Sequence, residues 1–345
     1  MRERMCTVAW LVVFFVMITA GPSSADRLPV WIDTDPACGL EATDDVDDCW
    51  ALLLALKSDA IAIRGVSTVF GNVSEERAYP VARQFLDRWV RSSGDPSPPI
   101  YRGAKEPVRK DDSDRSAAVL ALADALEKEP LMIVALGPLT NIASLLHTRP
   151  DLHRRVSSII AIAGSSEGER RFYFRDSGLL HFHDLNFLKD PWAFESVIET
   201  DVPLVLMPFE AAQKVRILPE DLAALTNAGE VEAWLAESSL GWMNFWRSRL
   251  GEDGFYPFDS LAMGYVIDPI HFACEPAKAR VNFRRGRIKA RDELIIDLDP
   301  ETESRITYCR GVSPGFHNTL MATLSRKRPG QILDTGTQNA PGEAE

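Results

Sequence analysis

A sixteen-residue segment that carries six aspartates and one glutamate lies between two apolar runs near the start of the chain. It begins at Asp33 and ends at Asp48, and it separates 28–32 from 49–56. Carboxylates this crowded between a buried strand and a buried helix repel one another. A bound hard cation with oxygen ligands is the simplest way to offset that charge. The segment therefore predicts a strand–loop–helix unit built around a metal ion.

The composition is ordinary for a globular protein of 345 residues, with 46% hydrophobic residues and a net charge of −12. This apolar fraction is enough for a sizeable core. The negative charge argues against nucleic acid as a partner and is compatible with cations and small neutral ligands.

The first residues have the pattern of a secretory signal peptide, with Arg2 and Arg4 before an apolar run over 8–20. We expect cleavage after Ala25 and a secreted or periplasmic protein that leaves the membrane. A membrane anchor is the alternative, but the run is shorter than the roughly 20 residues that span a bilayer. The remaining chain predicts one domain over 26–327 and a disordered, Pro/Gly-rich tail over 328–345.

Four cysteines remain once Cys6 leaves with the signal peptide, and their spacing is not that of a metal site. Cys274 and Cys309 both lie in the strand-like C-terminal part and are candidates for a disulfide in an oxidising compartment. Cys49 lies in the helix after the acidic segment, where a plain buried thiol is the expected state.

Strand-like and helix-like segments alternate along most of the chain, which is typical of an α/β fold. Strands are expected at 28–35, 61–69, 131–136, 156–163 and 203–207, and helices at 47–57, 74–91, 139–146, 191–199 and 230–249. Near the C-terminus, 279–288 and 294–298 predict an antiparallel pair. The fold class is therefore an open, mostly parallel sheet flanked by helices, with a C-terminal antiparallel strand pair.

Polar residues follow several of these strands, at the carboxyl edge where open parallel sheets bind ligands. Asp33 and Asp35 follow the first strand and Asn72 follows the second. Thr140 follows the third, and Asp259 lies in a later turn into a helix. We expect these distant residues to converge on one site.

These residues belong to motifs that resemble those of the inosine–uridine nucleoside hydrolase family. Five of them occur in the family's order: Asp33-Thr-Asp35-Pro with Asp47-Asp48, Val66-Ser-Thr-Val-Phe-Gly-Asn72, Gly137-Pro-Leu-Thr140-Asn141, Asp184-Leu-Asn186-Phe-Leu-Lys-Asp190-Pro and Phe258-Asp259-Ser-Leu-Ala. The resemblance runs from about residue 28 to at least 270. It implies an open α/β fold, a homodimer or homotetramer, and hydrolysis of the N-glycosidic bond of ribonucleosides.

The resemblance also implies one Ca²⁺ ion, held by Asp35, Asp48, Asp259 and the backbone carbonyl of Thr140. Asp35 would in addition act as the general base. Calcium accepts this mixture of carboxylate and carbonyl oxygens. Asp45 competes with the assigned aspartates for a metal or ribose role.

The substrate implied by the resemblance is a small nucleoside bound at both its sugar and its base. Asp47, Asn72, Asp184 and Asn186 would bind the ribose hydroxyls. Phe258, Trp242 and Trp246 are candidates to stack on the base, and Tyr256 is a further one. Alternatively, the two tryptophans are core residues of an amphipathic helix, because they lie four residues apart.

The chain departs from the family pattern at three places. About eight extra residues separate Asp35-Pro-Ala37 from Asp47, Phe258 replaces a histidine that protonates the departing base, and a glycine-rich loop is absent between Ala104 and Leu131. The last two differences keep open a non-catalytic nucleoside- or ribose-binding protein that retains the metal site. A phosphatase of the haloacid dehalogenase type is a third hypothesis, because Asp33-Thr-Asp35 resembles its nucleophile turn, but Ala37 does not fit that turn.

Overall fold

The computed structural model contains an open sheet with the strand order β10-β9-β11-β8-β5-β4-β1-β2-β3. The structure describes residues 27–109, 113–165, 172–173, 181–284, 292–298 and 304–327. The strands of this sheet are β1 (Leu28–Thr34), β2 (Ile61–Thr68), β3 (Ile100–Tyr101), β4 (Leu131–Ala135), β5 (Val156–Ile162), β8 (Leu204–Met207), β9 (Phe272–Asn282), β10 (Glu293–Leu298) and β11 (Ile306–Val312). A second, two-stranded sheet pairs β6 (Phe172–Tyr173) with β7 (His181–Phe182). The predicted signal peptide and C-terminal tail lie outside the described residues.

The strand pairing confirms the predicted fold class. From β3 to β11 neighbouring strands run parallel, whereas β9 is antiparallel to both β11 and β10. The predicted first strand of the C-terminal pair began too late, because β9 already starts at Phe272 and continues through Pro276. Pro276 argued against a strand at this point of the sequence, since proline is normally confined to edge or irregular positions of a sheet. The sequence also left β11 unassigned, although β11 connects the pair to the parallel strands.

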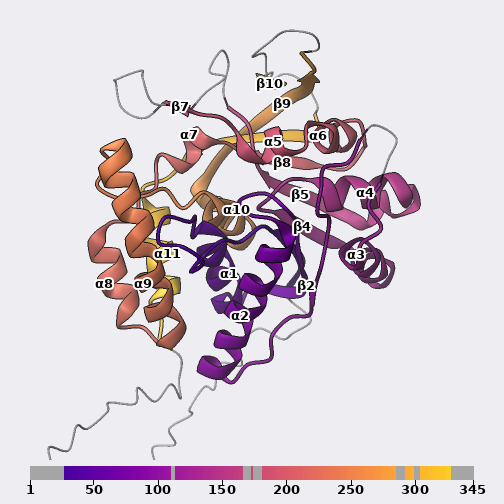
Figure 1. Cartoon of the computed structure of the whole chain (residues 1–345). Helices are drawn as coiled ribbons and strands as arrows, with labels where there is room; N and C mark the ends of the chain where they lie inside the picture. The colour runs from indigo at the N-terminus through magenta and orange to yellow at the C-terminus, as the bar shows by residue number, and fades with distance from the viewer. Residues whose placement is uncertain are drawn as a thin grey trace, which may run out of the picture.

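Helices cover both faces of the sheet (Figure 1). One hydrophobic cluster joins one face of the sheet to α1, α2, α8, α9, α10 and α11, and a second cluster joins the other face to α3, α4 and α6. The helices are α1 (Asp47–Lys57), α2 (Glu75–Ser93), α3 (Ala117–Lys128), α4 (Thr140–Thr148), η2 (Pro150–Arg155), α5 (Leu185–Lys189), α6 (Pro191–Ile198), α7 (Phe209–Ala212), α8 (Pro219–Thr226), α9 (Glu230–Phe245), the π-helical turn η3 (Trp246–Leu250), α10 (Phe258–Ile267), η4 (Pro269–His271) and α11 (Gly315–Leu324). Among the described residues, no helix combines the length and the apolar character needed to cross a bilayer.

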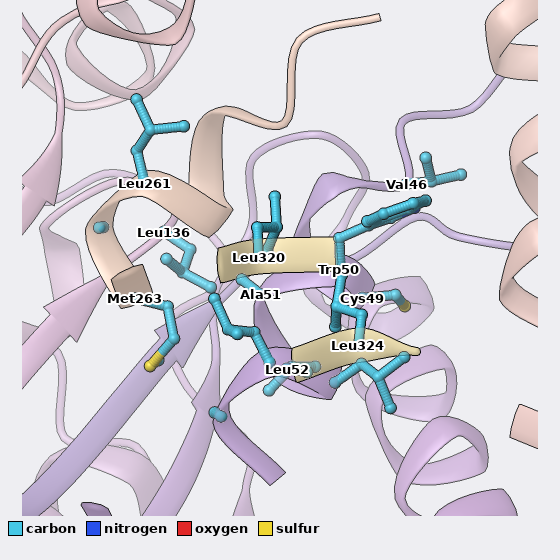
Figure 2. Packing of buried hydrophobic residues seen from close by; sticks show 14 of the residues in the cluster. Val46, Cys49, Trp50, Ala51, Leu52, Leu136, Leu261, Met263, Leu320 and Leu324 are labelled. Carbon is cyan, nitrogen blue, oxygen red and sulfur yellow. The ribbon is translucent and has the colours of Figure 1, made fainter. Parts of the chain in front are cut away.

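Helix α1 is buried over nearly its whole length, which explains why its sequence is apolar on every side. Its Trp50 and Leu52 lie in one cluster with Leu320 and Leu324 of α11 (Figure 2). At its C-terminal end, the buried Lys57 ammonium donates to Glu232 of α9 and to a backbone carbonyl of α11. Helix α1 is thus held by apolar packing along its length and by the Lys57 contacts at its C-terminal end.

Two disulfide bonds join the four cysteines of the described region. Cys274 pairs with Cys309, which confirms the candidate pair, and it links β9 to β11. Cys49 pairs with Cys38, so the prediction of a free buried thiol was wrong. The residues inserted after Asp35 turn back onto α1, and this return brings Cys38 to the first turn of the helix. Nothing in the spacing of the two cysteines revealed that turn.

Candidate active site

The polar residues of the site gather where β1 and β4 lie side by side in the sheet. Strand β2 lies next to β1 on one side, and β4, which comes later in the chain, lies next to β1 on the other side. The strand order therefore reverses between β1 and β4. Ligands of open α/β sheets bind at such points, beyond the carboxyl ends of the strands. Asp35 follows β1, and Leu136 and Gly137 follow β4.

Asp33 and Asn141 form a buried support beneath the site. The Asn141 side-chain amide donates to Asp33 Oδ1 at 2.8 Å and to the Thr68 carbonyl at 3.0 Å. The Ser67 hydroxyl also donates to Asp33, and the Ala104 amide donates to Asn141 Oδ1 at 2.9 Å. These bonds tie β1, β2 and α4 together, so the asparagine of the Gly-Pro-Leu-Thr-Asn motif has a structural task here.

Asp35, Asp48 and Asn72 form one hydrogen-bonded group. The Asn72 backbone amide donates to Asp35 Oδ2 at 2.6 Å, and its side-chain amide donates to Asp48 Oδ2 at 3.2 Å. The Asp35 amide and the Thr34 hydroxyl both donate to Asp48 Oδ1, the former at 3.1 Å. The sequence therefore predicted this convergence correctly, despite the residues inserted between Asp35 and Asp48.

The carboxylate of Asp35 lies between two glycines that leave it no spare room. A side chain on Gly71 would approach Asp35 Oδ2 to 1.9 Å, and one on Gly137 would approach Oδ1 to 2.7 Å. Asp35 is 1% exposed, and its Oδ1 has no hydrogen-bond partner. A buried, unsatisfied carboxylate oxygen is costly unless a ligand completes it.

Three carboxylates lie close enough to share a metal ion, and one of them, Asp48, also belongs to the group around Asp35. Ligand oxygens of Asp47, Asp48 and Asp259 are all within 4.8 Å of one another, and all three residues are buried. Asp47 and Asp48 open α1, whereas Asp259 lies in the first turn of α10. Oxygen donors of this kind suit a hard cation such as Ca²⁺. The residues therefore fit a divalent ion, and Asp47, expected only to bind ribose, belongs to the same group.

Burial and mutual repulsion make these carboxylates hard to ionise in the metal-free protein. Burial, with smaller contributions from neighbouring carboxylates, raises the pKa of Asp35, Asp47 and Asp259 well above the usual range. Burial also raises the pKa of Asp48 to about 6 and that of Asp33 to about 7. A divalent cation reverses this balance, because opposite charge favours the ionised form.

This electrostatic state predicts how the stability of the metal-free protein depends on pH. A carboxyl group whose pKa is higher in the folded than in the unfolded state, where it is about 4, favours folding at low pH. That stabilisation is lost as the pH rises from about 4 through about 6 for Asp48. Thermal unfolding in chelator should therefore show a melting temperature that falls between pH 4 and 7, and a divalent cation should cancel the fall. A melting temperature that rises over this range would contradict the assignment.

A cavity of about 350 Å³ opens above these carboxylates. Asp259 lines this cavity. All seven residues predicted to bind substrate line it too: Asp47, Asn72, Asp184, Asn186, Phe258, Trp242 and Trp246. The lining also includes residues that the sequence did not single out for this role: Thr43 and Asp44 from the inserted loop, His183, and Phe209 and Phe245 from the aromatic side. Phe209 follows β8 directly, so its place at the sheet edge was the signal that could have identified it.

Thr140 begins α4, shortly after the end of β4. Its hydroxyl donates to Asp190 at 2.7 Å, which fixes the side chain. The role assigned to Thr140 belongs to its backbone carbonyl, as a ligand of the ion, and it stays a prediction. Between β4 and Thr140, Leu136 lines the cavity, and a side chain on Gly137 would meet Asp35.

Asp184 and Asn186 are held in place by backbone groups at the ends of the strands. Asp184 caps α5, accepting from the Phe187 amide at 3.0 Å and from the Gly164 amide at 2.7 Å. Burial raises the pKa of Asp184 to about 6. Asn186 donates to the carbonyls of Leu136 at 2.7 Å and Ile162 at 3.1 Å. Both side chains are thus fixed at the cavity wall.

Aromatic rings that contact one another form a continuous part of the cavity lining, the aromatic wall. Phe258 stacks on Phe209 with ring centroids 5.4 Å apart, and Trp242 stacks on Phe245 at 5.2 Å. Trp246 is 3% exposed and packs edge-on against Tyr256, so it is a core residue that also reaches the cavity. Tyr256 is not part of the lining, because it lies behind Trp246.

Comparison with known proteins agrees with this fold. The model of the family described as inosine-uridine preferring nucleoside hydrolase matches residues 30–315. The non-specific ribonucleoside hydrolase RihC of Shigella sonnei (strain Ss046) is 25% identical over 298 residues, covering 79% of this chain and 89% of that protein. The protein of the same name from Escherichia coli O9:H4 (strain HS) is 26% identical with the same coverage.

Solved structures show the same fold. A plant nucleoside hydrolase, the PpNRh1 enzyme, has a TM-score of 0.70 and 20% identity, covering 87% of this chain and 99% of that chain. The purine-preferring ribonucleoside hydrolase from Gardnerella vaginalis also has a TM-score of 0.70, with 19% identity and coverage of 86% and 98%.

Fold and site together define an N-glycosyl hydrolase of the metal-dependent α/β type. The chain belongs to the inosine-uridine preferring nucleoside hydrolase family. This membership excludes the phosphatase hypothesis, and it makes ribonucleosides the class of substrate.

Proposed function

We propose that the protein hydrolyses the N-glycosidic bond of ribonucleosides to ribose and free base in a Ca²⁺-dependent reaction. The observation that carries the proposal is the unsatisfied, buried Oδ1 of Asp35 next to a group of carboxylates spaced for one cation. The lining of the cavity above them combines polar side chains with a cluster of aromatic rings. The polar side chains match the sugar of a nucleoside, and the aromatic rings match its base.

The proposed ligands of the ion are the carboxylates of Asp35, Asp48 and Asp259, with Asp47 beside them, and the backbone carbonyl of Thr140. All are hard oxygen donors, which favours Ca²⁺ over softer transition metals. When bound, the ion supplies positive charge that acidifies water and fixes the ribose hydroxyls.

Asp35 is the proposed general base. Its Oδ2 is occupied by the Asn72 amide, whereas Oδ1 has no partner within the protein and is available to take a proton from water. Asp47, Asn72, Asp184 and Asn186 would hold the ribose hydroxyls at the polar part of the lining. Positive charge develops on the sugar ring as the N-glycosidic bond breaks, and the surrounding carboxylates stabilise it.

The aromatic wall is the proposed site of the departing base. Phe258 occupies the position of the family's histidine, and it lies stacked against Phe209. A phenyl ring donates no proton, so this position contributes area and shape for a flat base instead.

The export of the protein and its oligomeric state are also proposals. The two disulfides in the described region support an oxidising compartment such as the periplasm or the extracellular space. A homodimer or homotetramer follows from the family resemblance alone.

Measuring free ribose released from inosine, adenosine and uridine, with and without chelator, tests the proposed function. We expect release that stops on chelation and returns with Ca²⁺. A shift in melting temperature on adding nucleoside, without any release of ribose, would favour a non-catalytic binding protein instead.

The ribose hydroxyls should contribute to rate as well as to affinity. We expect 2′-deoxyinosine to show a kcat about 10²-fold below that of inosine, because interactions that orient the sugar act mainly in the transition state. Steady-state kinetics on the two substrates measures this difference, since both carry the same base. An unchanged kcat with a higher KM would show that the hydroxyls contribute only to binding.

A further inference from the structure

The Cys38–Cys49 disulfide lies at the point where the two acidic halves of the site meet. Cys38 follows Asp35 by three residues, and Cys49 directly follows Asp48 in the first turn of α1. Both sulfurs are buried, since Cys38 is 2% exposed and Cys49 is 0% exposed. The bond therefore closes the chain between Asp35 and the Asp47–Asp48 pair.

The loop 37–45, most of which lies inside the ring that this disulfide closes, rests on helix α9. A side chain on Gly241 of α9 would come within 1.9 Å of the Ala42 carbonyl, so the helix and the loop touch through backbone. Gly39 has a φ of +78°, and a side chain there would come within 2.7 Å of the Trp234 ring. The loop thus packs closely against α9. Helix α9 is in turn hydrogen-bonded to α1, because the Trp50 indole donates to the Ser239 hydroxyl at 3.0 Å.

The same loop forms part of the cavity wall. Its Ala37, Thr43, Asp44 and Asp45 all line the cavity. Ala42 lies against Gly241, which precedes Trp242 of the aromatic wall. The loop therefore reaches both the ion site, through Asp35 and Asp47, and the side of the cavity that would receive the base.

We infer that Cys38 and Cys49 are positioning residues, whose disulfide holds the loop 37–45 as a substrate-contacting wall and keeps Asp35 in register with Asp47 and Asp48. This inference rests on the proposed function, because it assigns the loop to the same ion and nucleoside site. Ten residues lie between the two cysteines along the chain, and without the disulfide this stretch loses its covalent link to α1, one of the restraints that hold Asp35 relative to Asp47 and Asp48. A flexible loop must be ordered again each time the ion or the nucleoside binds.

Calorimetric titration with Ca²⁺ and steady-state kinetics with inosine test the inference on the full chain. We expect Cys38→Ala/Cys49→Ala to raise the Kd for Ca²⁺ about tenfold or more, and at saturating Ca²⁺ to raise KM more than it lowers kcat. The matched control is Cys274→Ala/Cys309→Ala, which removes the disulfide between β9 and β11, away from the cavity lining. It should leave the Kd and KM within about twofold of wild type.

Gly241→Ala tests the wall while leaving the disulfide intact. Alanine is a better helix former than glycine, so α9 itself is not weakened, but the new methyl group must push the loop away. We expect a KM for inosine several-fold above wild type and a Kd for Ca²⁺ within about threefold. If the double-alanine protein does not fold, Gly241→Ala still tests whether the loop contacts the substrate. An unchanged KM for inosine in this variant would contradict that contact.

The outcomes separate the inference from the proposed function. Wild-type protein that neither binds Ca²⁺ nor releases ribose would refute the proposed function. If the wild-type protein is active and Cys38→Ala/Cys49→Ala has the same Kd for Ca²⁺ and the same KM for inosine, the inference is overturned and the proposed function stands. Equal losses in both disulfide variants would overturn it too, because they would show a general effect on stability.

Discussion

Replacing Asp35 with asparagine is expected to lower kcat for nucleoside hydrolysis about 10³-fold, while the protein stays folded. Asparagine keeps the size of the side chain, so it fits between Gly71 and Gly137 where a larger group would not. It cannot accept a proton from water, and it offers the ion a weaker ligand. Ribose release measures the loss, and the melting temperature in chelator checks the fold.

Asp87→Asn is the matched control for this variant, because it makes the same chemical change on the exposed face of α2. It breaks only an exposed ion pair with Arg83, which contributes little to stability. Its turnover should equal that of wild type. Near-wild-type turnover by Asp35→Asn would remove Asp35 from the role of base.

Chelation is expected to have the second largest effect, on both activity and stability. An ion that binds only the folded state at 100 times its Kd adds about 2.7 kcal/mol to the free energy of unfolding. For a domain of this size, removing it should lower the melting temperature by about 5 °C and stop ribose release. Differential scanning calorimetry before and after chelation at pH 7, with readdition of Ca²⁺, measures both the loss and its reversal.

Asp48→Asn provides the control for chelation. Because Asp48 belongs to the proposed ligands, its variant should show no further fall in melting temperature when chelator is added. An unchanged melting temperature in wild type after verified removal of metal would count against the site.

The sequence predicted the framework of the site because its signals are local. Helix α1 begins and ends where the apolar run and its preceding aspartates indicated, and β1 and β2 end within one residue of the predicted bounds. The unbroken apolar run of α1 predicted that this helix is buried on every side. The alternation of strands and helices predicted that Asn72 comes shortly after β2. The convergence of Asp35, Asp48 and Asp259 needed the family's motif order in addition.

The remaining features depend on contacts between distant segments. The path of the inserted loop is set by Gly39 and Gly241 meeting Trp234 and Ala42, and no local pattern encodes that contact. The Cys38–Cys49 pair follows from the same path. The bond from the Thr140 hydroxyl to Asp190 is another such contact, because fifty residues separate the two along the chain.

The shared site itself can be measured by calorimetric titration of metal-free protein with Ca²⁺ at pH 7, because carboxylates from distant segments would then bind one divalent ion. We expect one ion bound per chain, with binding lost in both Asp48→Asn and Asp259→Asn, since these two residues lie far apart in sequence and their carboxylates come together in this group. Absence of binding in wild type, or binding unchanged in both variants, would refute a shared ion.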